Sequence, residues 1–66
     1  MSVAKVIELM AQGPSIEEAV QSAVDEASST VRNIKDVWIK DIEAIVENQQ
    51  VVTYRVNTKI TFLIEE

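Results

Sequence analysis

The side chains best suited to ligand contact in this 66-residue chain lie in its C-terminal half. Trp38, the single tryptophan, can stack on a flat ligand or anchor a contact between subunits, where tryptophan is common. Arg55 and Lys59 can hold an anionic group such as a phosphate, or pair with carboxylates of a neighbouring subunit. Both alternatives stay open for each of these three residues.

Residues that usually carry catalysis are missing. The chain has no histidine and no cysteine, which excludes nucleophilic catalysis of the Ser-His or Cys-His type. Gly13 is the single glycine, so a glycine-rich phosphate loop is excluded as well. Asp41 and Glu43 could form an acid-base pair, but such a pair needs a pocket, and we expect these carboxylates to be solvated or paired at an interface. The sequence predicts a binding protein and not an enzyme.

The length of the chain predicts one domain, residues 1–66, that needs support from outside its own core. A domain of this size buries only ~60% of the surface that its unfolded chain exposes. Without cysteine it has no disulfides, and without cysteine and histidine it lacks the preferred zinc ligands. Oligomerisation is the remaining common means of support.

The net charge of −5 and the pI of about 4.5 disfavour a nucleic-acid partner, because a phosphate backbone would be repelled. No segment is apolar over the length that a membrane span requires, and the Met1–Val6 start does not resemble a signal peptide. We therefore expect a soluble, cytoplasmic protein. Calcium could still bind where several copies bring oxygen atoms together, with ligands that the sequence does not identify.

The first half of the chain predicts a strand followed by a helix. Val3–Met10 is rich in β-branched and long apolar residues, and Ala11–Pro14 is expected to end this strand. Ser15 and Glu18 form a capping box at the start of a helix. Apolar residues then recur on one helical face, with small alanines that favour close packing on a sheet: Ile16, Ala19, Val20, Ala23, Val24, Ala27 and Val31. The helix is expected to end near Thr30–Asn33.

The second half predicts a β-hairpin, which gives an α+β fold of order β-α-β-β. Val37–Val46 and Val51–Ile64 favour strands, and the polar Glu47–Gln50 favours the turn. A turn centred between Asn48 and Gln49 predicts the pairs Val46/Val51, Ile42/Arg55, Lys40/Asn57 and Trp38/Lys59. The helix should then cover Val37, Ile39, Ile45, Val52, Tyr54, Val56, Ile60, Phe62 and Ile64. The opposite face should carry Asp36, Trp38, Lys40, Ile42, Ala44, Val46, Thr53, Arg55, Asn57, Lys59 and Thr61.

That opposite face predicts self-association. It is half apolar, and the chain has no second helix to cover it. The last strand would reach ~46 Å, against a compact diameter of ~28 Å for a domain of this size. It must therefore bend sharply or project into a partner, and a neighbouring copy is the natural cover.

Several segments resemble the dodecin family, and the likeness covers nearly the whole chain. They are the Val3–Leu9 opening, the Ser15 cap, the helix end at Thr30–Ile34, and Thr53–Val56 leading to Phe62. Dodecin subunits have three antiparallel strands that partly wrap one helix. Twelve copies form a hollow sphere, and members typically bind flavins pairwise between subunits. The resemblance thus implies a homododecamer that stores a flavin, FMN or riboflavin.

The resemblance also identifies candidate ligand contacts. In flavin-binding dodecins a tryptophan stacks on the isoalloxazine ring, and ungapped alignment places Asp36 at that position, with Trp38 two residues later on the same face. The flavin-contacting glutamine of the family's Tyr-Gln pair is replaced by Arg55. For a flavin site we predict Trp38 as the stacking residue, Arg55 at the ring edge or phosphate, and Asp36 and Asn57 as lining residues. The Tyr54-Arg55 pair resembles a divergent branch described as calcium-binding, so a calcium-binding or purely structural shell is the alternative.

Overall fold

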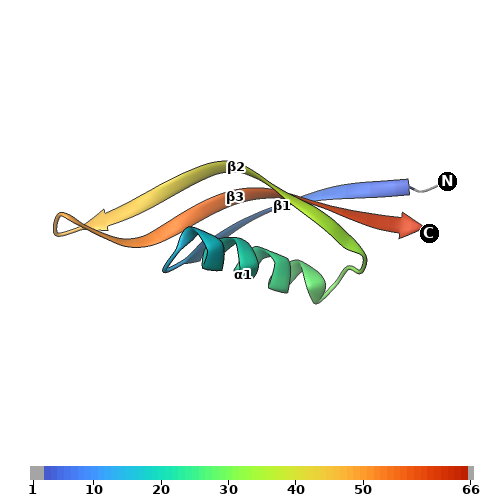
Figure 1. Cartoon of the computed structure of the whole chain (residues 1–66), viewed down its shortest axis with the longest axis horizontal. Helices are drawn as coiled ribbons and strands as arrows, with labels where there is room; N and C mark the ends of the chain where they lie inside the picture. The colour runs from blue at the N-terminus through green and yellow to red at the C-terminus, as the bar shows by residue number, and fades with distance from the viewer. Residues whose placement is uncertain (1–2, 66) are drawn as a thin grey trace.

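The structure, a computed structural model, describes residues 3–65. Four elements follow one another along the chain (Figure 1): β1 (Val3–Gly13), α1 (Ile16–Ser28), β2 (Ile34–Glu47) and β3 (Gln50–Glu65). The predicted order β-α-β-β is confirmed. The hairpin strands are both longer than predicted, which makes the molecule elongated, with extents of 51 × 19 × 13 Å.

β1 continues three residues beyond its predicted end. Ala11, Gln12 and Gly13 pair with β3 in the same antiparallel register as the residues before them, so the predicted end of the strand at Met10 was three residues too early. Pro14 ends the strand, because it has no N–H to donate to the sheet. Glycine is needed at position 13 for steric reasons, because a Cβ there would lie 2.8 Å from the backbone nitrogen of Ala19.

The helix begins as its capping box predicts. The Ser15 side chain accepts a hydrogen bond from the Glu18 N–H at 3.1 Å, and its hydroxyl donates to the Glu18 carboxylate at 3.3 Å. Three alanines, Ala19, Ala23 and Ala27, are buried one turn apart. Their small side chains let α1 lie close against the sheet, where it contacts all three strands.

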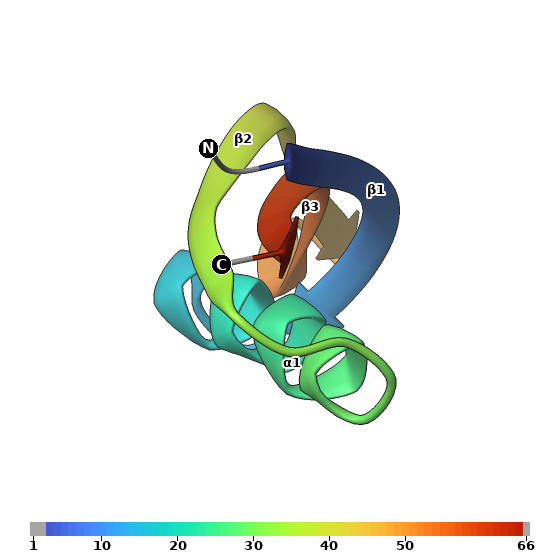
Figure 2. The ribbon, with the colours of Figure 1, turned by 90° about the vertical axis from the view of Figure 1, so that its right-hand side faces the viewer.

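The sheet is antiparallel with β3 in the centre, in the order β1-β3-β2. Viewed along the long axis, the strands arch over α1, which lies on the concave side (Figure 2). Val56 and Ile60 of β3 are completely buried there, and Thr58 between them donates its hydroxyl to the Leu9 carbonyl at 2.8 Å. The three-stranded sheet that partly wraps one helix is therefore confirmed, with β3 as the centre of the core.

The helix covers only the middle of the sheet. A 13-residue helix is ~20 Å long, whereas the 16 residues of β3 extend over ~50 Å. Val52 and Ile64, predicted to lie under the helix, are consequently about half exposed. The hairpin tip projects well beyond the helix (Figure 1), so β3 extends past the part of the sheet that α1 covers, and its projection into a partner stays a prediction.

The hairpin register differs from the simple prediction in its middle. Val46/Val51 and Trp38/Lys59 pair as predicted, but Arg55 pairs with Glu43 and Asn57 with Asp41. The register shifts between Ile45 and Val46 and shifts back between Ile39 and Asp41, so Val52 and Lys40 are the extra residues of two β-bulges. The predicted pairs Ile42/Arg55 and Lys40/Asn57 are therefore wrong.

The bulges move several β2 side chains to the other face, because directly paired residues share a face. Ile42 and Ala44 pair with Val56 and Tyr54, so they lie on the side of the helix and not on the opposite face. Ile45 pairs with Thr53 and moves the other way. Asp41 and Glu43 replace Ile42 and Ala44 on the face away from the helix, which is more polar than predicted.

The hairpin turn has a two-residue loop, Asn48-Gln49, closed by the pair Glu47/Gln50. Both loop residues have positive φ, 52° and 66°, as a type I′ turn requires. Asparagine tolerates this conformation, but glutamine carries a Cβ that disfavours it. The polar turn predicted at Glu47–Gln50 is confirmed, with strain at Gln49.

Gln49→Gly should stabilise the protein. Glycine adopts positive φ without steric cost, so we expect the free energy of unfolding to rise by about 0.5–1 kcal/mol. Urea denaturation at one fixed protein concentration measures the change. The matched control is Gln50→Gly at the adjacent strand position, which should destabilise. Equal losses of stability in both variants would contradict the assignment of backbone strain to Gln49.

Candidate ligand-binding site on the sheet

The sheet face away from α1, termed the outer face, gathers the chain's aromatic and charged candidates. Its position follows from the register, since its members alternate along each strand with residues on the helix side, except at the bulge, where the consecutive Lys40 and Asp41 both lie on the outer face. The outer face carries Val6, Glu8, Met10 and Gln12 of β1, Asp36, Trp38, Lys40, Asp41, Glu43 and Ile45 of β2, and Thr53, Arg55, Asn57, Lys59 and Thr61 of β3.

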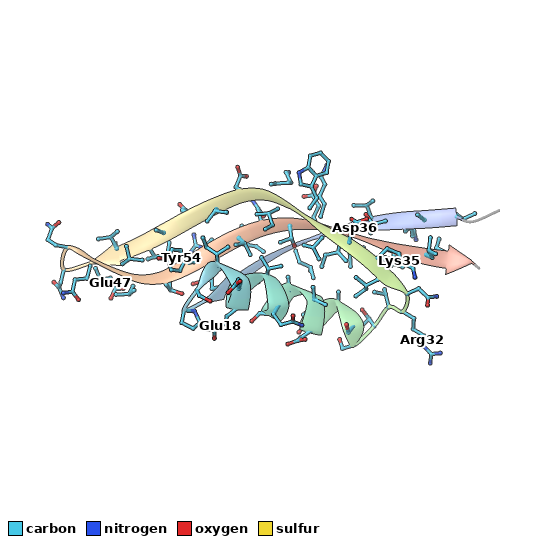
Figure 3. The ribbon with its side chains drawn as sticks, in the orientation of Figure 1. Glu18, Arg32, Lys35, Asp36, Glu47 and Tyr54 are labelled. Carbon is cyan, nitrogen blue, oxygen red and sulfur yellow. The ribbon has the colours of Figure 1, made fainter. Side chains whose placement is uncertain are left out.

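All four predicted site residues lie on the outer face, but not in one cluster. Asp36 pairs with Thr61 near the start of β2 (Figure 3), and Trp38, two residues further along β2, pairs with Lys59. Arg55 is four residues from Lys59 along β3, a separation of ~13 Å. Asn57 lies between them. One flat ligand on Trp38 can therefore reach Asn57 more readily than Arg55.

Trp38 has 66% of its surface exposed, which is unusual for the largest apolar side chain. The ammonium of Lys59 lies over its ring, 5.6 Å from the ring centroid. That distance is within the range of a cation–π contact. The ring is thus available for stacking, and a cation is its immediate neighbour.

The Glu8 carboxylate of β1 forms ion pairs with a lysine on each of the other two strands. Its carboxylate lies 3.8 Å from the Lys40 ammonium and 3.9 Å from the Lys59 ammonium. All three side chains are partly exposed, so each ion pair is screened and contributes little to stability by itself. Glu8, Lys59 and Trp38 form a row across the three strands, and Lys40 lies beside that row.

Arg55 belongs to a second polar group farther toward the hairpin tip. Its Nη1 donates to Glu43 Oε1 at 3.3 Å. Its Nε is buried and has no acceptor within the described residues. An unsatisfied guanidinium donor is costly, so Arg55 is incompletely bonded within residues 3–65. Tyr54, the preceding residue, pairs with Gly13 on the helix side and is half-buried (Figure 3), as its predicted packing role requires.

The outer face is open. No pocket is found over residues 3–65, and the described residues contain no group of three or more acidic, histidine or cysteine side chains able to hold a metal ion. Any ligand on this face would be covered on one side only. A closed site would need atoms from another molecule.

Sequence reasoning missed the part that Glu8 plays. Its position on the outer face follows from strand alternation, but its contact with Lys40 and Lys59 depends on β3 being the central strand. The one available signal was that Glu8 is the only carboxylate in β1. Asp41 and Glu43 were missed as outer-face residues because β2 has no glycine that could mark a bulge.

The fold is a small α+β unit of order β-α-β-β whose outer face is open, with no enclosed pocket over residues 3–65. The family model for dodecins matches residues 3–65. The chain belongs to the dodecin family.

Solved structures agree with that assignment. A tryptophan-to-phenylalanine mutant of T. thermophilus dodecin has 28% identity and a TM-score of 0.90, with 100% of both chains covered. Dodecin from Streptomyces coelicolor has 29% identity and a TM-score of 0.88, covering 98% of this chain and 94% of that one. Dodecin from Streptomyces davaonensis, at 18% identity, shares the fold, with a TM-score of 0.88 over 98% of this chain and 97% of that one. A search of the curated proteins finds no match.

In the part of the chain that the structure describes, no helix has the length and the apolar character needed to cross a membrane.

Proposed function

We propose that this chain assembles into a homododecameric shell that binds and stores a flavin, FMN or riboflavin, between its subunits. Family membership supports both the assembly and the ligand class. The observation that carries the proposal is the exposed indole of Trp38 on a sheet face that lacks a second layer. A flat aromatic ring stacked there would cover one of the largest exposed apolar surfaces of the subunit.

The residues on the outer face fit a flavin. Trp38 offers an exposed ring for stacking, and aromatic side chains stack on flat heterocycles in a way that tolerates different rings. Asn57 offers an amide that can donate to and accept from the polar ring edge, with Asp36 lining the site. Arg55, whose Nε has no acceptor within residues 3–65, can bond a ring carbonyl or the phosphate of a ligand that reaches toward it.

The open shape of the site supports placement between subunits. A single subunit provides one face only, so a second copy must provide the other wall. This also explains why the chain needs no catalytic groups: storage by enclosure requires binding and exclusion of solvent, and no bond has to be made or broken.

Trp38→Ala should weaken FMN binding by about five- to 150-fold, because stacking on one aromatic side chain is worth about 1–3 kcal/mol. Titration of FMN with protein, followed by flavin fluorescence, measures the dissociation constant. Trp38→Phe keeps a stacking ring and is the matched control, with a smaller loss expected. Unquenched FMN at micromolar concentrations of the unaltered protein would refute flavin binding, and equal affinity in Trp38→Ala would refute the role of Trp38.

A further inference from the structure

Trp38 is an exposed side chain on an edge strand, yet its ring has a close neighbour. In the sheet order β1-β3-β2, the strand of Trp38 is bonded to β3 alone. Lys59 of β3 pairs directly with Trp38, and its ammonium lies 5.6 Å from the centroid of the ring. One side of the indole therefore faces a cation, while Trp38 as a whole keeps 66% of its surface exposed.

The ammonium of Lys59 is itself restrained. Its second neighbour is the Glu8 carboxylate of β1, at 3.9 Å, and Glu8 pairs with Lys59 on the other side of β3. The ammonium thus lies between a carboxylate and an aromatic ring, on a side chain that starts from the central strand. Lys40 approaches the same carboxylate at 3.8 Å, but Lys59 is the lysine that lies over the Trp38 ring.

From this geometry we infer that Lys59 is a positioning residue for Trp38: its cation holds the ring in one orientation and leaves the opposite side of the ring for a stacking ligand. The inference rests on the proposed flavin site and adds how its stacking residue is prepared. A side chain loses rotamer freedom when a ligand stacks on it, and a ring that is already oriented loses less. A cation–π contact at an exposed site favours one orientation by about two- to fivefold.

The effect on affinity follows from the population of that orientation. When the binding-competent state is a smaller fraction of the free protein, the apparent dissociation constant rises in proportion. Lys59→Gln removes the cation and should therefore weaken riboflavin binding by about two- to fivefold. Riboflavin is the probe because it has no phosphate, so the lost lysine charge does not act on an anionic group of the ligand. Fluorescence titration of riboflavin measures the constant.

A second measurement needs no flavin. Trp38 is the single tryptophan of the chain, so tryptophan emission reports on this ring alone. In the ligand-free protein, removal of the cation should free the ring, and we expect a larger fast component in the time-resolved fluorescence anisotropy of Lys59→Gln. This measurement tests the restraint on Trp38 separately from the proposed function.

Two control variants separate the position of the cation from its charge. Lys59→Arg keeps a cation beside the ring and should keep both the affinity and the restrained anisotropy of the unaltered protein. Lys40→Gln removes the same charge and a partner of the same carboxylate, but it leaves the Lys59 ammonium over Trp38, so it should change neither. Sedimentation of each variant checks that the particle is unchanged.

Tighter riboflavin binding in Lys59→Gln would overturn the inference, because it would show that the ammonium competes with the ligand for the ring. Unchanged ring motion in Lys59→Gln, or equal changes in Lys40→Gln, would overturn it as well. If the unaltered protein binds no riboflavin but the ring is freed in Lys59→Gln alone, the proposed function fails while the restraint of Trp38 by Lys59 stands.

Discussion

A protein carrying Val46→Lys together with Val51→Glu is expected to sediment near the subunit mass of 7.4 kDa, whereas the unaltered protein should sediment as a particle many times larger. Val46 and Val51 pair directly near the hairpin tip and are 56% and 50% exposed. The tip lies beyond the reach of α1 (Figure 1). If neighbouring copies cover these side chains, each valine contributes up to about 1.5–3 kcal/mol at every contact, and charged replacements remove that contribution.

The substitution is designed to spare the hairpin. Lysine and glutamate face each other across the strands and attract, and the net charge of the chain does not change. Gln50→Lys is the matched control: it creates the same kind of pair with Glu47 one step nearer the turn (Figure 3), without removing apolar surface. An assembly that survives the double substitution would show that the tip is not a subunit contact. Unaltered protein that is folded at the subunit mass would refute the shell.

The second large effect is expected in the core. Ile60 is completely buried at the centre of β3, in contact with Ala23 and Ala27. Ile60→Ala should lower the free energy of unfolding by about 2–5 kcal/mol, through lost burial and the cavity that remains. A domain of this length has only ~3–10 kcal/mol in total. The variant should therefore be partly unfolded at ambient temperature unless assembly supports it.

Ile60→Val is the graded control, with an expected loss of about 0.5–1.5 kcal/mol for a single methyl group. Urea denaturation followed by circular dichroism should be done at equal subunit concentration, because assembly makes stability depend on concentration. Midpoints that do not separate Ile60→Ala from Ile60→Val would contradict the assignment of Ile60 to the centre of the core.

Assembly and ligand binding should be linked, because the proposed function places both on surface that the subunit leaves uncovered. Trp38 and the tip valines are all exposed, yet they lie at different places along the hairpin. A flavin that binds between subunits stabilises the assembled state by mass action. The tip substitutions should therefore weaken flavin binding indirectly, while Trp38→Ala should leave sedimentation largely unchanged.

The family resemblance came from short segments, and the family model and solved structures confirm it, but those segments do not specify the ligand. By that resemblance, Trp38 lies two residues beyond the position of the family's stacking tryptophan, and Arg55 stands where flavin-binding members have glutamine. The structure adds the surroundings of these residues, with Lys59 on the Trp38 ring and Glu43 on Arg55. These neighbours are groups that any ligand on the outer face would meet.

The sequence by itself determined the features that depend on residues close together in the chain. The Ser15–Glu18 cap, the buried alanine stripe of α1 and the Asn48-Gln49 turn were all predicted, since each follows from contacts within a few residues. The end of the first strand was not predicted correctly from the sequence. β1 continues through Ala11 and Gln12 because β3 provides hydrogen-bond partners there.

Only the tertiary structure decided which side chains share the outer face and what they touch. The bulges at Lys40 and Val52 exchange Ile42 and Ala44 for Asp41 and Glu43 on that face, because one extra residue reverses every later side chain until a second bulge restores the alternation. Glu8 of β1 reaches Lys40 of β2 because both strands pair with β3, which aligns the two residues across it. Such contacts join residues distant in sequence, and alternation within a single strand does not specify them.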